Sequence, residues 1–173
     1  MINQTFELER LSHTTIKPDA LRVLVFSLAK TATEQVEYFF ALPVESVLKV
    51  IPCPPINWAV GGELGMADIG SDNVTTLDLH RHFFPHTSKV INDSPFLVLL
   101  NTITSETCGI PVTGLPVLTD IPLSTIRPVS LSYRQVATID FASHMAILSD
   151  PENNKSIKIF LLGMSELIES SIS

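Results

Sequence analysis

The hydrophobic residues of this chain fall into short runs separated by polar turns. Residues 22–29 read RVLVFSLA, a nearly continuous apolar and β-branched run that is typical of a strand buried on both faces. A polar stretch at 31–37 and the run YFFAL at 38–42 complete a predicted hairpin. Further strands are predicted at residues 74–79, 95–102, 107–112, 121–127, 135–142, 145–148 and 157–162. About ten short strands predict a mainly β fold, a barrel or a sandwich, with a few short helices.

The helical signals are few and short. Apolar residues at helical spacing follow Pro43, a residue suited to a first helical position, and predict a helix at 44–51. Asp78 offers an N-cap for a second helix at 79–84. A helical turn at 164–168 is predicted to close the fold.

The domain boundaries follow from where the pattern weakens. Residues 1–20 lack a strong period and predict either a short amphipathic helix with Phe6, Leu8 and Leu11 or a loosely attached arm. Residues 170–173 predict a frayed tail. A single globular domain is therefore expected over residues 21–169, with a looser echo of hairpin, small helix and hairpin in each half.

The stretch 62–84 concentrates polar and flexible residues, including three of the seven glycines. Residues 74–79 are predicted to be a central strand, and residues 65–73 a loop that forms the working surface. If Gly70 avoids a positive φ, the substitution Gly70→Arg is expected to change partner binding and leave folding intact.

The composition and net charge of the chain limit the classes of function that it can have. The chain is 45% hydrophobic and 17% charged, against about 25% charged in an average protein, so apolar surface is expected to remain for a partner. A net charge of −7 with only 11 Lys and Arg disfavours nucleic acid. No signal-like segment begins the chain, and its apolar runs are far shorter than the ~20 residues of a membrane span. A soluble, cytoplasmic protein is expected.

The sequence contains few candidate residues for a metal site or a catalytic site. Asp78, His80, His82 and His86 form the densest cluster, but on a helix His80 and His82 point about 200° apart, which makes a poor metal site. Cys53 and Cys108 are expected to be buried, reduced thiols. No nucleophile elbow, phosphate loop or paired-carboxylate spacing occurs. We therefore expect no catalytic residues, no metal and no cofactor.

The order of several strings resembles the CheW-like family, the adaptor domains of chemotaxis signalling. LRVLVFSLA and YFFALPVESVLKVI resemble its first hairpin and the element after it. GMADIGSDNVTTLDL resembles the pattern Gly-hydrophobic-x-Asn-Leu-Arg-Gly and the run that follows it. TCGIPVTGLPVL, IPLSTIRP and KIFLLGMSELI resemble the later strands and the closing segment, so the resemblance spans residues 21–169.

The resemblance implies two SH3-like five-stranded barrels that share a hydrophobic core. It implies a non-enzymatic adaptor in chemotaxis, motility or phototaxis, which couples a CheA-type histidine kinase to methyl-accepting chemoreceptors by protein–protein docking. In the family, a groove between the barrels receives the receptor tip, and the barrel ends meet the kinase.

The chain departs from the family pattern at several polar positions. The family's Arg aligns with Gly70, its Asn with Asp68, an acidic residue with Lys49, and the Asp of a Val-Asp motif with Thr113. Losing the Arg removes five donors and a fixed charge. A kept fold with altered partner specificity is therefore expected, with the partner-binding surface at Val47, Lys49, Gly65, Asp68 and Gly70.

Two other functions remain open from the sequence. A small-molecule sensor would use a cleft between the barrels, supported only by the apolar bias and Trp58. A metal-assisted hydrolase would use His80, His82 and His86. Weak homo-oligomerisation is also left open, because small barrels expose strand edges.

Overall fold

The computed structural model of the chain describes residues 19–28, 39–83, 95–101, 105–132, 142–150 and 152–163. The arm, the tail, the helical turn at 164–168, most of the predicted strand 135–142 and His86 lie outside these residues. The chain divides into two compact units, and each contains one six-stranded sheet. Unit 1 comprises residues 1–26, 38–44 and 116–173, and unit 2 comprises residues 27–37 and 45–115.

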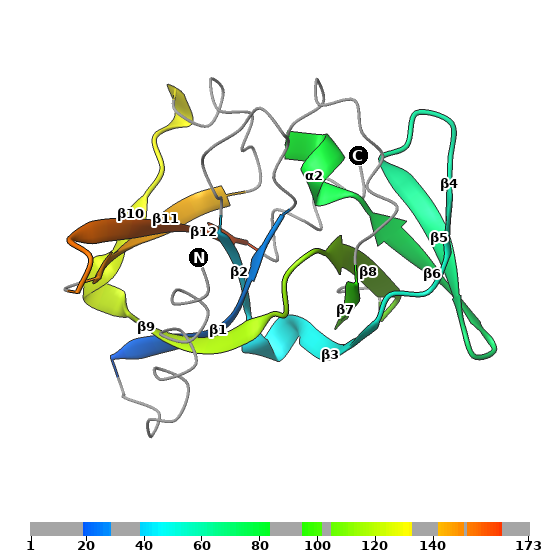
Figure 1. Ribbon diagram of the computed structural model, residues 1–173, viewed down its shortest axis with the longest axis horizontal. Coiled ribbons are helices and arrows are strands. Elements are labelled where there is room, and N and C mark those ends of the chain that lie inside the picture. The colour runs from blue at the N-terminus through cyan, green and yellow to red at the C-terminus, as the bar shows by residue number, and fades with distance from the viewer. Residues whose placement is uncertain are drawn as a thin grey trace. The chain divides into compact units, whose positions relative to one another are not determined.

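Unit 1 combines the two ends of the chain in one sheet (Figure 1). Its strand order is β10-β11-β12-β2-β1-β9. The strands are β1 Ala20–Ser27, β2 Phe39–Pro43, β9 Val117–Pro122, β10 Ile126–Pro128, β11 Ala142–Asp150 and β12 Lys155–Leu162.

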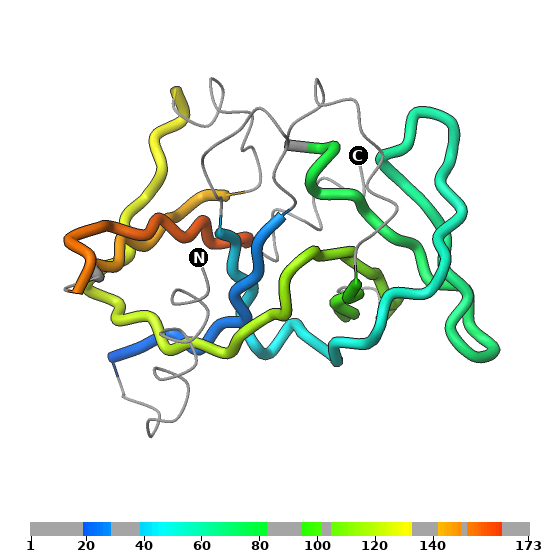
Figure 2. Tube along the Cα trace, viewed as in Figure 1, coloured from blue at the N-terminus to red at the C-terminus, as the bar shows by residue number. Residues whose placement is uncertain are grey.

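The two edges of this sheet belong to one continuous stretch of chain. Edge strand β9 runs through the short 3-10 helix η2, Leu123–Thr125, directly into the opposite edge strand β10, as the tube in Figure 2 shows. At this bend, the hydroxyl of Thr125 donates to the carbonyl oxygen of Pro122 at 2.7 Å. The stretch thus crosses from one edge to the other and closes the sheet into a barrel, which protects both edges.

Unit 2 is closed in the same way. Its strand order is β3-β7-β8-β6-β5-β4, and the passage 53–55 joins the two edge strands β3 and β4. Helix α2, Leu79–Phe83, follows the central strand β6. The strands are β3 Val47–Pro52, β4 Ile56–Trp58, β5 Leu64–Ile69, β6 Asp72–Leu77, β7 Phe96–Asn101 and β8 Thr107–Val112.

The sheets of the two units have the same arrangement of strands, but the strands at equivalent places follow one another in a different order along the chain. Starting from the bent segment, unit 1 runs β9-β1-β2-β12-β11-β10 and unit 2 runs β3-β7-β8-β6-β5-β4. Each has one parallel neighbour pair at the same place, β2 with β12 and β6 with β8. When each bent segment is counted as one strand, each barrel has five strands, so the predicted mainly β fold with two five-stranded barrels is confirmed. The expected shared core stays a prediction.

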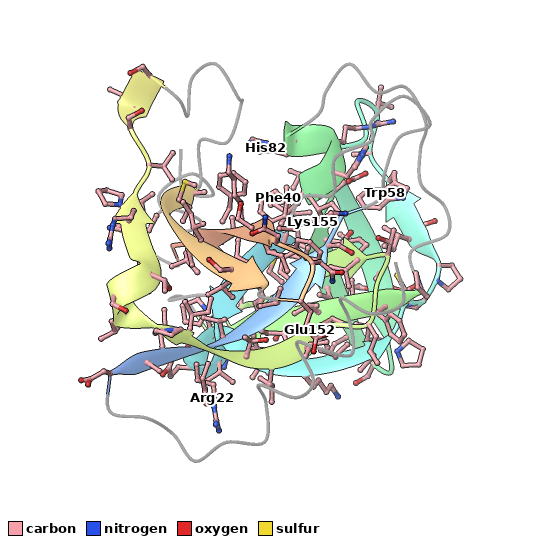
Figure 3. The ribbon with its side chains drawn as sticks, turned by 60° about the vertical axis from the view of Figure 1, so that its left-hand side comes forward. Arg22, Phe40, Trp58, His82, Glu152 and Lys155 are labelled. Carbon is pink, nitrogen blue, oxygen red and sulfur yellow. The ribbon has the colours of Figure 1, made fainter. Side chains whose placement is uncertain are left out.

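In unit 1, strand β1 is buried on both faces, as its sequence predicts. Val23 and Val25 join the barrel interior with Ile121 and Ile159. On the opposite face, Phe26 stacks on Phe40 of β2 with ring centroids 6.2 Å apart. Phe40 in turn contacts Phe160 of β12 at 5.9 Å (Phe40 is labelled in Figure 3). Full burial of each such side chain contributes about 1.5–3 kcal/mol to folding.

Strands β7 and β8 of unit 2 occupy the places of β1 and β2 and are buried in the same two-sided way. Leu97 and Leu99 pack with Val74 of β6 in the barrel interior. Val98 and Ile110 alternate with them onto the other face, and both are at most 1% exposed. Strands β1 and β7 occupy equivalent places in the two sheets. Both are continuous apolar runs, because a strand at this place is buried on both faces.

Two local predictions were wrong. The predicted helix 44–51 is a three-residue 3-10 helix, Val44–Ser46, followed by β3. Its β-branched residues pair with the sequence-distant strand β7, and this pairing overrides the helical spacing. The predicted loop 65–73 is instead most of a β-hairpin formed by β5 and β6.

The second helix prediction was right, because α2 begins after Asp78. The backbone N–H of Arg81 donates to the Asp78 carboxylate at 3.0 Å, which is the bond expected of an N-cap. In the described part of the chain, no helix is long and apolar enough to cross a membrane.

Candidate functional site

The expected working surface is the hairpin β5–β6, whose tip is a two-residue turn. Ile69 and Asp72 are paired, so Gly70 and Ser71 form the turn. Gly70 has a φ of +63°, whereas Ser71 does not have a positive φ, which is the pattern of a type II′ turn. The condition attached to the expected Gly70→Arg result is therefore not met, because any side chain at Gly70 strains the backbone.

Gly65 has a structural role inside the barrel of unit 2. A Cβ at this position would lie 2.6 Å from Cγ2 of Ile56, 2.7 Å from Cε3 of Trp58 and 2.9 Å from the Thr76 hydroxyl oxygen. Trp58 therefore packs directly on the bare backbone of β5. This close approach explains both the glycine and the tryptophan without a bound ligand.

The loop between β4 and β5 presents an exposed apolar residue on a tight turn. The N–H of Gly62 donates to the carbonyl oxygen of Ala59 at 2.8 Å, and Gly61 has a φ of +100°, as in a type II turn. Val60 at the apex is fully exposed. Because the turn is hydrogen-bonded, Val60 is held in a defined place.

Helix α2 clamps this loop. A guanidinium N–H of Arg81 donates to the carbonyl oxygen of Gly61 at 2.9 Å, and the guanidinium occupies the space that a Cβ on Gly62 would need. Nδ1 of His82 lies 2.9 Å from a Glu63 carboxylate oxygen, and the Asp78 N–H donates to the Glu63 carbonyl at 2.9 Å. The charged residues that crowd this stretch thus serve to fix the loop to the helix.

The histidines do not form one site. His80 is buried, at 5% exposure, whereas Nδ1 of His82 contacts Glu63 at the surface (His82 is labelled in Figure 3). Within the described ranges, no group of three His, Cys, Asp or Glu side chains is placed to hold a metal ion. His86, the third ligand of the metal hypothesis, lies outside those ranges.

Val47 and Lys49 flank a β-bulge at the start of β3. Val47 pairs with Leu100 and Lys49 with Leu99, so Leu48 is an extra residue in the strand. Lys49 is exposed and Leu48 is 48% exposed. A bulge bends a strand and redirects side chains, and here it presents an apolar and a basic group side by side.

The five candidate residues therefore fall into two places and one interior position. Val47 and Lys49 lie on edge strand β3, while Asp68 and Gly70 lie at the hairpin tip. Three strands separate β3 from β5 in the sheet order. Gly65 packs inside the barrel, and the contact of the five residues with a partner stays a prediction.

Unit 1 carries a bidentate ion pair on its first edge. Nε and a terminal nitrogen of Arg22 donate to the two carboxylate oxygens of Asp120 at 2.8 and 3.1 Å (Arg22 is labelled in Figure 3). The hydrogen bond to Asp120 raises the pKa of Arg22, and the carboxylate charge adds to it. The pair locks the register of β1 against β9, where these two residues are direct cross-strand partners.

Both cysteines are reduced and partly buried, close to the prediction. Burial raises the pKa of the Cys53 thiol, which lies 3.5 Å from the carbonyl oxygen of Pro54. Burial also raises the pKa of Cys108, although a backbone hydrogen bond at Gly109 acts in the opposite direction. A thiol with a raised pKa is protonated at neutral pH and is therefore a poor nucleophile.

The comparisons with known proteins address the fold. No protein-family model and no curated protein sequence matches the chain. The fold matches the crystal structure of the scaffolding protein TtCheW from Thermoanaerobacter tengcongensis with a TM-score of 0.62. The match covers 83% of this chain and 89% of that chain, at 15% sequence identity. The chain has the CheW fold.

Several surface residues of this CheW fold were missed by the sequence analysis. Leu48 was assigned to the predicted helix 44–51 and Met66 to the predicted loop 65–73, whereas Leu64 was assigned to no element. All three are about half exposed on strands. The alternation of Leu64 and Met66 with the small residues Gly65 and Ala67 is the signal that predicts a strand with one outward apolar face.

Proposed function

We propose that this chain is a non-enzymatic adaptor in chemotaxis-type two-component signalling. It would couple a CheA-type histidine kinase to methyl-accepting chemoreceptors by protein–protein docking. The observation that supports the proposal most is the CheW fold, matched over 83% of the chain to a scaffolding protein. The resemblance of ordered strings over residues 21–169 points the same way.

The polar groups on and before helix α2 are also consistent with a protein that acts by docking to a partner. Asp78 caps α2, Arg81 binds the Gly61 carbonyl and His82 contacts Glu63. These groups hold a surface loop in shape, as expected when a surface must be preorganised for a partner.

The bulge on β3 is the proposed kinase-docking element. Leu48 supplies exposed apolar area and Lys49 an adjacent charge, the combination in which a central apolar contact gives affinity and a charge gives specificity. The acidic residue expected here from the family is replaced by Lys49. The partner surface is therefore proposed to carry a complementary acid.

Titration of the full chain with the regulatory domain of its cognate CheA-type kinase, and separately with a chemoreceptor signalling tip, tests the function. Binding to at least one of them is expected. Lys49→Glu is expected to weaken kinase binding by about tenfold. Lys155→Glu, an exposed lysine of unit 1, is the matched control and is expected to bind normally. No binding of either partner at high micromolar concentration would exclude the adaptor function.

A further inference from the structure

Exposed apolar residues lie on the outer side of edge strand β9 in unit 1 and just after it. Val117 and Ile121 belong to the core of the barrel. Leu118 and Pro122 alternate with them along the strand and therefore face outward. Leu118 is 43% exposed, and Leu123, the first residue of η2, is 51% exposed. We name this surface the β9 strip, made of Leu118, Pro122 and Leu123.

The charge beside the β9 strip is already paired. Asp120 lies between Leu118 and Pro122 on the same side of the strand, and its carboxylate accepts two hydrogen bonds from Arg22 of β1. The Asp120 side chain is only 8% exposed. Because a paired carboxylate needs less contact with water than an isolated one, the strip can be covered by a mainly apolar segment.

The chain that precedes β1 leaves the sheet directly beside this strip. Strands β1 and β9 are neighbours in Figure 1, and Ala20 is the cross-strand partner of Pro122. The backbone N–H of Leu123 donates to the carbonyl oxygen of Asp19 at 2.9 Å. We name residues 1–18 the leading segment. This segment therefore joins the described structure at the residue that is hydrogen-bonded to Leu123.

The leading segment contains apolar residues that can reach the whole strip. Phe6, Leu8 and Leu11 are its larger apolar side chains in this part of the sequence. The eight residues from Leu11 to Asp19 can extend over about 26 Å. The five residues from Leu118 to Leu123 rise only about 17 Å. Leu11 and the residues before it can therefore lie against any part of the β9 strip.

The covalent connection favours this segment over a separate molecule. A segment joined to its site by a short flexible linker has an effective concentration of about 1 mM. A contact that would have a Kd of about 0.1 mM between separate molecules is then about 90% populated. Weak apolar packing is thus sufficient for the segment to cover the strip.

We propose that the leading segment folds back and covers the β9 strip of its own chain. Its apolar side chains pack on Leu118 and Leu123, next to the point where Asp19 holds the segment to the sheet. The contact is intramolecular and reversible, so any apolar partner of the strip has to displace it. This inference does not depend on the kinase or the receptor.

Hydrogen exchange of the full chain at low micromolar concentration, read by mass spectrometry, tests the inference. Amides of residues 1–18 are expected to exchange about tenfold more slowly than in a free peptide of the same sequence, as the populated contact implies. Leu118→Gln is expected to remove most of this protection. Ile147→Gln, at a similarly exposed position of β11 in the same unit, is the matched control and is expected to leave it unchanged.

A variant on the other side of the contact completes the test. The double variant Phe6→Gln and Leu11→Gln is expected to lose the same protection as Leu118→Gln. Unchanged exchange of β11 and β12 checks that each variant folds. Exchange of wild-type residues 1–18 at the rate of the free peptide would overturn the proposal. Protection that survives Leu118→Gln would overturn it as well, and so would protection that rises with protein concentration, because the occupant would then be a second copy.

Discussion

Gly70 shows how one backbone angle determines what a residue does. It aligns with an arginine in the family that the sequence resembles, which made it the most informative candidate for docking. Its φ of +63° at the hairpin tip gives it a conformational role, and its contact with a partner stays a prediction. Asp68, two residues earlier and exposed on the strand, is therefore the better position for testing partner contacts at this end of the hairpin.

Replacing Gly70 should cost stability through the backbone alone. A Cβ at this position meets no atom within 4 Å, so the cost of Gly70→Ala is the left-handed conformation, about 1–2 kcal/mol. Gly70→Asn should cost less, because asparagine tolerates that conformation better. Urea unfolding of both variants measures the difference. Equal losses for alanine and asparagine would contradict the backbone explanation.

The two partly buried thiols should make the free energy of unfolding depend on pH in the alkaline range. Burial raises the pKa of Cys53 and of Cys108 above the usual value of 9.0 in the folded protein. The unfolded chain therefore loses these protons first, and the free energy of unfolding should fall as pH rises above about 8.5. Below that pH the contribution is fully present.

Urea unfolding in reductant at about pH 7.5 and about pH 9.5 measures this effect. The decrease in stability between the two pH values should be smaller in Cys108→Ala than in the wild type. The difference between the two proteins cancels the titration of other groups. An unchanged decrease would show that Cys108 ionises equally easily in both states.

At the scale of elements, α2 and the β4–β5 loop act as one unit. The Arg81 guanidinium binds the Gly61 carbonyl and fills the space beside Gly62, while Glu63 is held by His82 and by the Asp78 N–H. The helix has only five residues, so its own hydrogen bonds cannot sustain it. The helix and the loop therefore stabilise each other.

Removing the clamp should loosen the loop before it unfolds the protein. Arg81→Ala is expected to speed amide hydrogen exchange of Gly62 and its neighbours and to cost about 1 kcal/mol of global stability. Arg127→Ala is the matched control, because that guanidinium donates to the carbonyl oxygens of Ser124 and Ile126 in its own turn. Exchange near Gly62 that stays slow in Arg81→Ala would show that the arginine is not the clamp.

Three of the four edge strands are built in ways that oppose the addition of another strand. β4 and β10 have only three residues each, and β3 carries a bulge, an exposed lysine and a terminal proline. Proline and charge block the addition of another strand to an edge. Exposed apolar side chains lie on inner strands, at Leu64, Met66 and Ile147, and on edge strands, at Leu48 of β3 and Leu118 of β9.

At the scale of the whole molecule, the two permuted barrels differ in how far apart their pairing strands are in sequence. Unit 2 forms from the continuous stretch 45–115, apart from residues 27–37. In unit 1, Arg22 of β1 must find Asp120 of β9, 98 residues away. Closing a longer loop costs more chain entropy before any contact forms, and non-local pairing slows folding.

Unit 2 should therefore become protected before unit 1 during refolding. Pulse-labelling hydrogen exchange is expected to show early protection of β5–β8 and later protection of β1, β9 and β12. The comparison is internal, since the two barrels share one strand order. Simultaneous protection of both sheets, or earlier protection of β1 and β9, would contradict this order.

The pattern of apolar residues was sufficient to locate the strands that are buried on both faces. The runs at β1, β7 and β12 were located within a few residues, because continuous β-branched and aromatic positions have few other stable arrangements. The start of α2 was also readable, since a capping carboxylate acts on amides only three residues away.

The identity of β3 and the roles of the candidate site residues depend on contacts between strands that are distant in sequence. Val47, Val50 and Ile51 fit a helix or a strand, and only pairing with β7, about 50 residues away, selects the strand. The role of Gly65 depends on Trp58, the positive φ of Gly70 on the hairpin register, and the role of His82 on Glu63. Local sequence encodes burial, periodicity and caps. The candidate site depends on which strands pair and in which register, and those choices are made by contacts between residues far apart in the chain.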